Sequence, residues 1–231
     1  MRLNLKWMIL LSIVVAGLEV GLLVSLLLAR FNGRQPSSHS GPQTAYEGTE
    51  LEGLAPGFRF VDQNGASMAL SDFRGWVVVL TFLDNRCQDV CPLTALHLRL
   101  TYERLKREGV DASHVVFLGV NVNVEANKSA DVMKFTKEYG LDRIPTWHFL
   151  TGAREELEPV WKAYAITVYR PQGEEGEIVH TPGVFLIDQR GDKRWYISTP
   201  LYDESSTAPW TGPVLSDLLV KQIKRLIKPG N

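Results

Sequence analysis

The stretch WVVVLTFLDNRCQDVCP, residues 76–92, decides the fold, because it joins an apolar run to a helix through a pair of cysteines. The apolar first half, rich in valine, predicts a buried β-strand. Pro92 opens the segment 92–108, and proline is well suited to the first turn of the helix that we expect there. Cys87 and Cys91, the two cysteines of the chain, therefore lie at a strand-to-helix junction.

Such a junction suits redox or metal chemistry. Unpaired backbone N–H groups and the helix dipole stabilise a thiolate at a helix N-terminus and lower its pKa. A structural disulfide is the alternative, but closing so short a loop would contribute only about 2 kcal/mol in the loop-entropy model. Cβ atoms four residues apart on a helix are about 5–6 Å from each other, which is wide for a relaxed disulfide. Two thiolates on one face suit a metal ion at least as well.

The composition describes one ordinary domain with an appendage. Of the 231 residues, 45% are hydrophobic and 22% are charged, and the formal net charge is −1. This balance excludes a disordered chain and gives no indication of nucleic-acid binding. The sequence also contains no Gly-rich phosphate loop and no nucleophile elbow.

The N-terminus predicts a transmembrane signal anchor over residues 1–30. The apolar run 7–29 would span roughly 35 Å as a helix, and a bilayer core is about 30 Å thick. Glu19 costs roughly 3 kcal/mol at the centre of the run, and the many Leu, Ile and Val residues offset this at roughly 0.3–0.6 kcal/mol each. No small-residue cleavage site follows. We expect an uncleaved single-pass anchor in the cell membrane, with the soluble domain on the extracytoplasmic side.

The rest of the chain divides into a tether and a domain. Residues 31–54 are polar and rich in Ser, Gly and Pro, which predicts a flexible linker, and the domain is expected over 55–231. Asn64-Gly65 predicts a hairpin between 58–62 and 66–70. Further strands are expected at 115–122, 184–187 and 193–197, and helices at 129–139, 155–164 and 214–227.

Strands that alternate with helices describe an α/β three-layer domain. A dithiol at the end of the central strand favours the thioredoxin-like fold. Both predictions concern the segment 55–231, and the membrane anchor lies outside it.

Three stretches together resemble the Sco/SenC family of copper-binding, thioredoxin-fold proteins. The first, TFLDNRCQDVCPLT at 81–94, is similar to that family's C-x-x-x-C-P segment. The second is WHFLTG at 147–152, followed by VWKAY at 160–164. The third is IVHTPGVFLID at 178–188, where the family places a histidine just before a strand. The resemblance runs from about Leu54 to the end of the sequence, and a membrane anchor suits it.

The resemblance implies a copper site made by Cys87, Cys91 and His180. Soft thiolates select Cu(I), and imidazole serves both Cu(I) and Cu(II), so this set can hold copper in both oxidation states. Family members are associated with delivering copper to the binuclear centre of cytochrome c oxidase subunit II, or with reducing the cysteines of that centre. The expected partner is therefore that subunit or another exported copper or thiol protein.

The chain departs from the family pattern in three places. Gln88 stands where the family usually has proline, and Val179 stands where an aspartate often precedes the histidine and orients the imidazole. Thr181-Pro182 resembles the Thr-Pro, usually cis, that faces the active dithiol of thioredoxins proper. A thiol–disulfide oxidoreductase, in which Cys87 attacks and Cys91 resolves, therefore stays open as the alternative to a copper carrier.

The other candidate residues have less support. Asp89, between the cysteines, either tunes the site or caps the helix. His97 lies on the cysteine helix at a position that points it away from the thiols, and His148 is expected to pack or cap a turn. The remaining histidines, His39 and His114, have no neighbouring ligands in the sequence.

Overall fold

The computed structural model describes residues 46–171, 178–198 and 213–227. These residues belong to one compact unit, 45–231, which is distinct from residues 1–44. The anchor predicted over 1–30 lies outside the described residues. Among the helices that the structure describes, none is both long enough and apolar enough to cross a bilayer.

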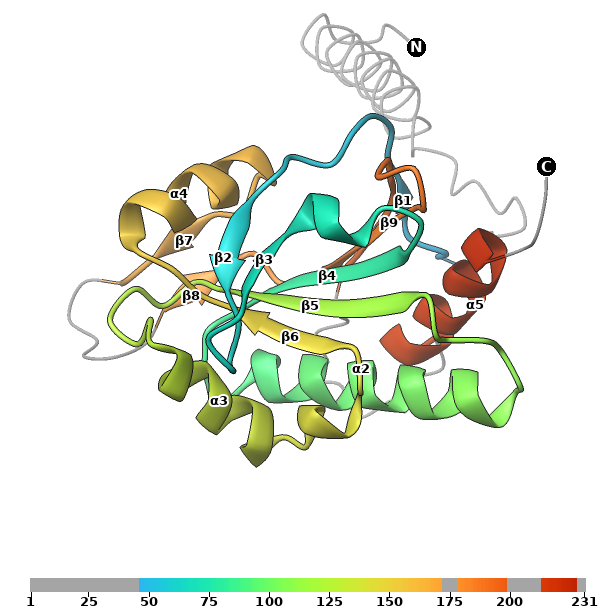
Figure 1. Ribbon diagram of the computed structural model, residues 1–231, viewed down its shortest axis with the longest axis horizontal. Coiled ribbons are helices and arrows are strands. Elements are labelled where there is room, and N and C mark those ends of the chain that lie inside the picture. The colour runs from blue at the N-terminus through green and yellow to red at the C-terminus, as the bar shows by residue number, and fades with distance from the viewer. Residues whose placement is uncertain (1–45, 172–177, 199–212, 228–231) are drawn as a thin grey trace, which may run out of the picture. The chain divides into compact units, whose positions relative to one another are not determined.

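A six-stranded mixed sheet forms the centre of the unit, in the order β1–β10–β9–β4–β5–β6 (Figure 1). The strands are β1 (Thr49–Glu50), β4 (Val77–Leu83), β5 (Val115–Asn121), β6 (Trp147–Leu150), β9 (Val184–Ile187) and β10 (Lys193–Ile197). β4, β5 and β6 run parallel, whereas β9 runs antiparallel to β4. Every residue of β4 is buried, as expected for a strand of a sheet that is covered on both faces.

Helices cover both faces of this sheet. They are α2 (Val90–Arg107), α3 (Ser129–Glu138), α4 (Arg154–Ala163) and α5 (Leu215–Ile227), with 3₁₀ turns η1 (Leu70–Phe73) and η2 (Leu141–Arg143). α2, α3 and α5 pack on one face, and α4 packs on the other (Figure 1). The hairpin formed by β2 (Arg59–Val61) and β3 (Ser67–Ala69) lies on the α4 side. This is a three-layer α/β domain.

Alternate residues of β4 supply the two cores. Val77 and Val79 join the cluster beneath α2, α3 and α5, whereas Val78 and Leu80 join the cluster beneath α4 and the hairpin. Successive side chains of a strand point to opposite faces of the sheet, so an uninterrupted apolar run is needed to fill both cores. The carboxyl end of β4 is thereby held rigidly between two packed layers.

The expected strands at 76–83, 115–122, 184–187 and 193–197 and the expected hairpin and helices are confirmed to within two or three residues. The helix after the cysteines begins at Val90 rather than at Pro92, so Cys91 lies in its first turn. β6 is not predicted by the sequence. Thr49–Glu50, inside the predicted tether 31–54, forms the edge strand β1 on β10, so the folded part begins before residue 55.

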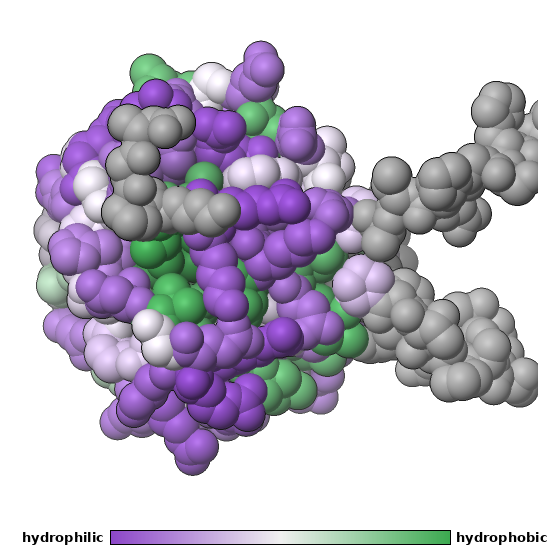
Figure 2. All heavy atoms as spheres, turned by 90° about the vertical axis from the view of Figure 1, so that its right-hand side faces the viewer, coloured by the Kyte–Doolittle hydropathy of each residue, from purple (hydrophilic) through white to green (hydrophobic). Residues whose placement is uncertain are grey.

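Ion pairs and buried apolar residues both join α5 to the rest of the unit. Lys221 and Arg225 pair with Glu47, and Lys224 pairs with Glu108 at the end of α2. Figure 2 shows the side of the molecule on which α5 lies, and that side is largely hydrophilic with hydrophobic residues gathered near its middle. Exposed ion pairs contribute about 0–1 kcal/mol each, so the apolar contacts of α5 with α2 supply most of its attachment.

Candidate functional site

Asp84, at the end of β4, builds the loop that carries Cys87. The Asp84 Oδ1 atom accepts a hydrogen bond from the N–H of Arg86 at 2.9 Å, and the Asp84 carbonyl accepts one from the N–H of Cys87 at 3.2 Å. An Asp side chain that binds the backbone two residues further on forms an Asx turn. The turn leads to Asp89, which occupies the N-cap position of α2 but makes no side-chain capping bond.

The two cysteines are free thiols in unequal surroundings. Cys91 is 1% exposed, whereas Cys87 is partly buried and lines a cavity of about 440 Å³. A hydrogen bond from Cys91, with others from the backbone N–H groups of Cys91 and Asp89, lowers the pKa of Cys87 to about 6. The hydrogen bond to Cys87 and burial hold the pKa of Cys91 well above its usual value. Cys87 is therefore the thiolate of the pair near neutral pH, as its place at a helix N-terminus predicts.

His180 approaches the dithiol from strand β8 (Val179–His180), which pairs with β7 (Val168–Tyr169). The Nε2 atom of His180 lies 3.3 Å from the Sγ atom of Cys91. Its Nδ1 atom lies 3.2 Å from the Thr181 carbonyl oxygen, and Nδ1 must carry the proton because a carbonyl only accepts. Nε2 therefore presents its lone pair to Cys91. Burial lowers the pKa of His180, which favours this neutral form.

Hydrogen bonds on both sides fix the segment that follows His180. Thr181 donates its N–H to the Thr167 carbonyl and accepts from the Thr167 N–H at its hydroxyl, both at 3.0 Å. The hydroxyl of Thr81, in the middle of β4, donates to the Gly183 carbonyl at 2.8 Å. The imidazole is thereby attached to the same central strand that leads to the cysteines.

The three departures from the family pattern have identifiable places. Val179 is exposed, and the Thr181 carbonyl is the acceptor that orients the imidazole in the absence of an aspartate there. Gln88 is exposed and lines the cavity beside Cys87. The Thr181–Pro182 bond is trans, since the described part of the chain contains no cis peptide bond.

The other described histidines lie away from the dithiol, in contact with other groups. His97 faces α5, with its Nδ1 atom 3.4 Å from the Ser216 hydroxyl, so it points away from the thiols as predicted. His114 lies 3.0 Å from the Ser113 hydroxyl and packs on a tryptophan ring. His148 lies within β6, where its Nδ1 atom is 3.0 Å from a carboxylate oxygen of the buried Asp62. His39 lies outside the described residues.

Sequence reasoning missed Asp84. This residue is 1% exposed, and its Oδ1 atom also accepts a hydrogen bond from Asn123 Nδ2 at 2.8 Å. The signal that could have found it is an acidic residue directly after a fully apolar strand and just before the cysteines.

The contacts between the candidate ligands are pairwise. The thiol of Cys91 donates a hydrogen bond to Cys87, and its sulfur lies 3.3 Å from the Nε2 atom of His180. Within residues 46–171, 178–198 and 213–227, no three His, Cys, Asp or Glu side chains are already grouped as a metal site. Two sulfurs and an unprotonated imidazole nitrogen are nonetheless donor types that soft and borderline metal ions prefer.

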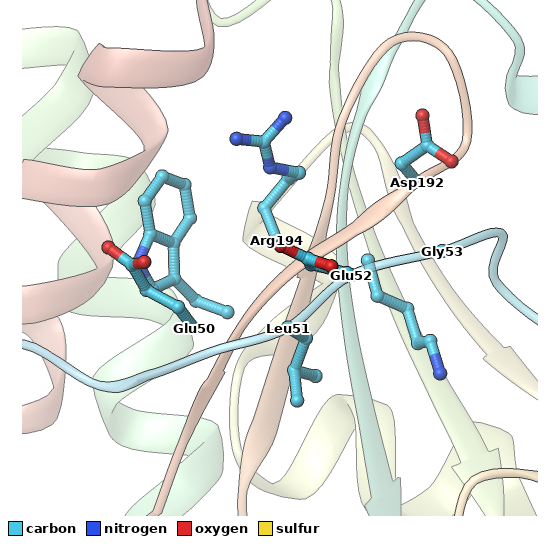
Figure 3. Close-up of a pocket in the computed structure, with 8 residues that line it drawn as sticks. Glu50, Leu51, Glu52, Gly53, Asp192 and Arg194 are labelled. Carbon is cyan, nitrogen blue, oxygen red and sulfur yellow. The ribbon is translucent and has the colours of Figure 1, made fainter.

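A second cavity, of about 480 Å³, lies at the edge of the sheet (Figure 3). It is lined by Glu50 and the residues that follow β1 on one side, and by Asp192 to Trp195 of β10 and its turn on the other. Neither the cysteines nor His180 line it. The cavity of about 440 Å³ adjoins the candidate site at Cys87, whereas Cys91 and His180 do not line it.

The chain is similar to known proteins in sequence. The SCO1/SenC family model matches residues 47–208. The SCO1 protein homolog of Bacillus subtilis (strain 168) is 29% identical over 136 residues, which cover 58% of this chain and 68% of that protein.

Two solved structures share the fold. A SCO1/SenC family lipoprotein from Bacillus anthracis str. Ames has a TM-score of 0.59 at 23% identity, over 81% of this chain and 100% of that chain. Arabidopsis thaliana ScoI with copper bound has a TM-score of 0.59 at 20% identity, over 75% and 99%. Since the family match spans more than half of the sequence, this chain, with its dithiol at the end of the central strand of a thioredoxin-like fold, belongs to the SCO1/SenC family.

Proposed function

We propose that this protein is a membrane-anchored, extracytoplasmic copper carrier that acts in assembly of the copper centre of cytochrome c oxidase. The observation that carries the proposal is the 3.3 Å contact between His180 Nε2 and Cys91 Sγ, next to the Cys87 thiolate. Membership of the SCO1/SenC family supports it, and so does the related ScoI structure with copper bound.

Copper is the cargo in this proposal, and Cys87, Cys91 and His180 are its ligands. Cys87 already supplies a thiolate near neutral pH, and His180 supplies the Nε2 lone pair. Cys91 becomes a ligand by giving up its proton, so uptake releases protons and affinity rises with pH. Because the present contacts are pairwise, uptake draws Cys87 and His180 together around the ion that Cys91 binds.

The anchor and the partner complete the proposal. We place residues 1–30 in the membrane as a single span, on the strength of the apolar run 7–29, with the folded unit outside the cytoplasm. The receiving partner is oxidase subunit II or another exported copper or thiol protein. Transfer by ligand exchange would begin at Cys87, since it is the more exposed of the two sulfurs.

A competition titration against a chromophoric Cu(I) chelator tests the proposal, with the reduced full-length protein in detergent. We expect tight one-to-one binding that His180→Ala weakens by at least about tenfold, since even residues that only support a ligand are worth roughly 10–100-fold. Cu(II) binding should weaken more, because imidazole is the ligand that suits it. His114→Ala, which removes an exposed histidine, is the matched control and should leave the affinities for Cu(I) and Cu(II) unchanged. Loose binding that is indifferent to His180 would contradict the proposal.

A thiol–disulfide oxidoreductase is the second candidate, and it is favoured by the difference in exposure and in pKa between the two thiols. The more exposed Cys87 would attack a substrate disulfide, and the buried Cys91 would resolve the mixed disulfide. In this case Cys91→Ser accumulates a mixed disulfide with a peptide disulfide substrate, and Cys87→Ser does not. His180→Ala would leave the reaction nearly unchanged, which distinguishes this function from copper transport.

A further inference from the structure

A buried carboxylate lies in the loop that carries the dithiol, three positions before Cys87. Asp84 is 1% exposed, and its Oδ1 atom is held by two neutral donors, the N–H of Arg86 and the amide of Asn123. Within the described part of the chain, Asp84 forms no salt bridge. A buried charge without a counter-ion is costly. Because the surroundings have a low dielectric constant, it also repels or attracts nearby charges more strongly than an exposed charge would.

Asp84 is also attached to both cysteines through its backbone. Its carbonyl accepts the hydrogen bond from the N–H of Cys87, and its own N–H donates to the Cys91 sulfur. These bonds hold the backbone of Asp84 against that of Cys87 and against the sulfur of Cys91. The hydrogen bonds from Arg86 and Asn123 to its Oδ1 atom, together with burial, hold the carboxylate in place rather than turned into water.

The charge of Asp84 acts on all three candidate ligands. The Cys91 hydrogen bond is the main cause of the lowered pKa of Cys87, and the Asp84 charge opposes it. The bond to Cys87 and burial raise the pKa of Cys91, and the Asp84 charge adds to them. Burial lowers the pKa of His180, and the Asp84 charge opposes that shift as well. In each case the negative charge disfavours an anion or favours a cation.

Asp89 provides the contrast within the same loop. It lies between the cysteines in sequence, but its side chain is exposed and makes no capping bond. Water and salt screen an exposed charge much more than a buried one. Both acidic residues are close to the cysteines in sequence, but only Asp84 is buried. A comparison of the two therefore separates the effect of burial from that of proximity.

We propose that the buried Asp84 carboxylate sets the redox equilibria of the Cys87–Cys91–His180 site, favouring the disulfide over the dithiol and Cu(II) over Cu(I). A fixed negative charge at low dielectric repels the Cys87 thiolate of the reduced form and has no such effect on an uncharged disulfide. It also attracts the more highly charged copper ion. The first effect needs no metal, whereas the second rests on the copper-carrier function proposed above.

The metal-free equilibrium can be measured against glutathione. The Cys87 thiolate attacks glutathione disulfide, forms a mixed disulfide and releases one glutathione thiolate, which takes up the proton of Cys91. The Cys91 thiolate then attacks the Cys87 sulfur, closes the protein disulfide and releases the second glutathione thiolate, which takes up a proton from the solvent. Two electrons pass from the protein sulfurs to glutathione disulfide, which is reduced to two molecules of glutathione.

The experiment uses the full-length protein in detergent and compares Asp84→Asn with Asp89→Asn in glutathione redox buffers. We expect Asp84→Asn to lower the equilibrium constant for oxidation by about tenfold, which makes the two-electron potential about 30 mV more positive. Asp89→Asn should stay within about twofold of the wild type, because its charge is already screened. Competition titrations should show the ratio of Cu(II) to Cu(I) affinity falling by about tenfold in Asp84→Asn only.

A folded Asp84→Asn protein whose glutathione equilibrium stays within about twofold of the wild type overturns the inference, and so does an equal shift in Asp89→Asn. A shift in the glutathione equilibrium without tight copper binding supports the role of Asp84 and instead refutes the copper carrier. Circular dichroism checks folding. Should the asparagine variant not fold, Asp84→Ser also removes the charge and supplies a hydroxyl oxygen that can accept from the N–H of Arg86, so the same measurement decides.

Discussion

The Nε2 atom of His180 lies 3.3 Å from the Sγ atom of Cys91, although 89 positions separate the two residues in the chain. Cys91 also donates a hydrogen bond to Cys87, so the buried cysteine, rather than the partly buried one, lies at the centre of the site. The reactivity of Cys87 therefore depends on Cys91, the same residue that His180 contacts.

Replacement of Cys91 should change the reactivity of Cys87 according to the donor that remains. The hydrogen bond from Cys91 is the largest cause of the lowered pKa of Cys87, so Cys91→Ala should raise that pKa and slow alkylation by iodoacetamide at pH 6.5 by roughly tenfold. Cys91→Ser keeps an O–H donor and should slow it less. Equal rates for the two variants would show that the hydrogen bond is not the cause.

The alkylation of Cys87 should depend on pH with a midpoint near its pKa of about 6. The thiolate is the reactive form, so the rate should rise through this midpoint and level off above about pH 7. A plot of rate against pH in the reduced protein measures this. A midpoint near 8.5, the ordinary value for a free cysteine, would contradict the arrangement at the N-terminus of α2.

Asp62 should make the free energy of unfolding depend on pH in the acidic range. Burial alone would raise its pKa, but hydrogen bonds from His148 and from the N–H groups of Ala66 and Asn64 outweigh burial and lower it. A carboxyl whose pKa is lowered on folding stabilises the fold above its ordinary pKa of about 4, and this stability is lost as the pH falls further.

Urea unfolding measures this effect. Asp62→Asn should reduce the free energy of unfolding by about 1–3 kcal/mol at pH 7 and should also reduce the difference between pH 7 and pH 3. Asp142→Asn, at an exposed aspartate in η2, is the control and should change neither quantity. A similar loss in both variants would show that the buried contact with His148 contributes nothing special.

Gly183→Ala should disturb the segment that carries His180. Gly183 has a φ of 147°, and a Cβ atom there would lie 2.5 Å from the Tyr196 hydroxyl, which donates to the Pro182 carbonyl. We expect a loss of about 1–3 kcal/mol in the free energy of unfolding, together with weaker copper binding. Gly65→Ala is the matched control, since Gly65 also has a positive φ but has no atom within 4 Å of the added Cβ. It should cost about 1 kcal/mol and leave copper binding unchanged.

The elements that the sequence predicts well are those with a long or distinctive local pattern. β4 is an uninterrupted apolar run. The hairpin between β2 and β3 contains Asn64-Gly65, a residue pair that is typical of tight hairpin turns. β6 has four residues, and β7 and β8 have two each, too short to show a period. Such strands form because neighbouring strands supply hydrogen-bond partners, which a local pattern cannot reveal.

The amino-acid sequence by itself determined that two cysteines lie where a buried strand meets a helix, because that junction depends only on neighbouring residues. Tertiary structure alone decided that β8 brings His180 to Cys91 and that Asn123 and the loop enclose the charge of Asp84. Both outcomes depend on contacts between distant parts of the chain. Burial and distance are properties of packed layers, so the chemistry of the site is set by the fold around a motif that the sequence already displays.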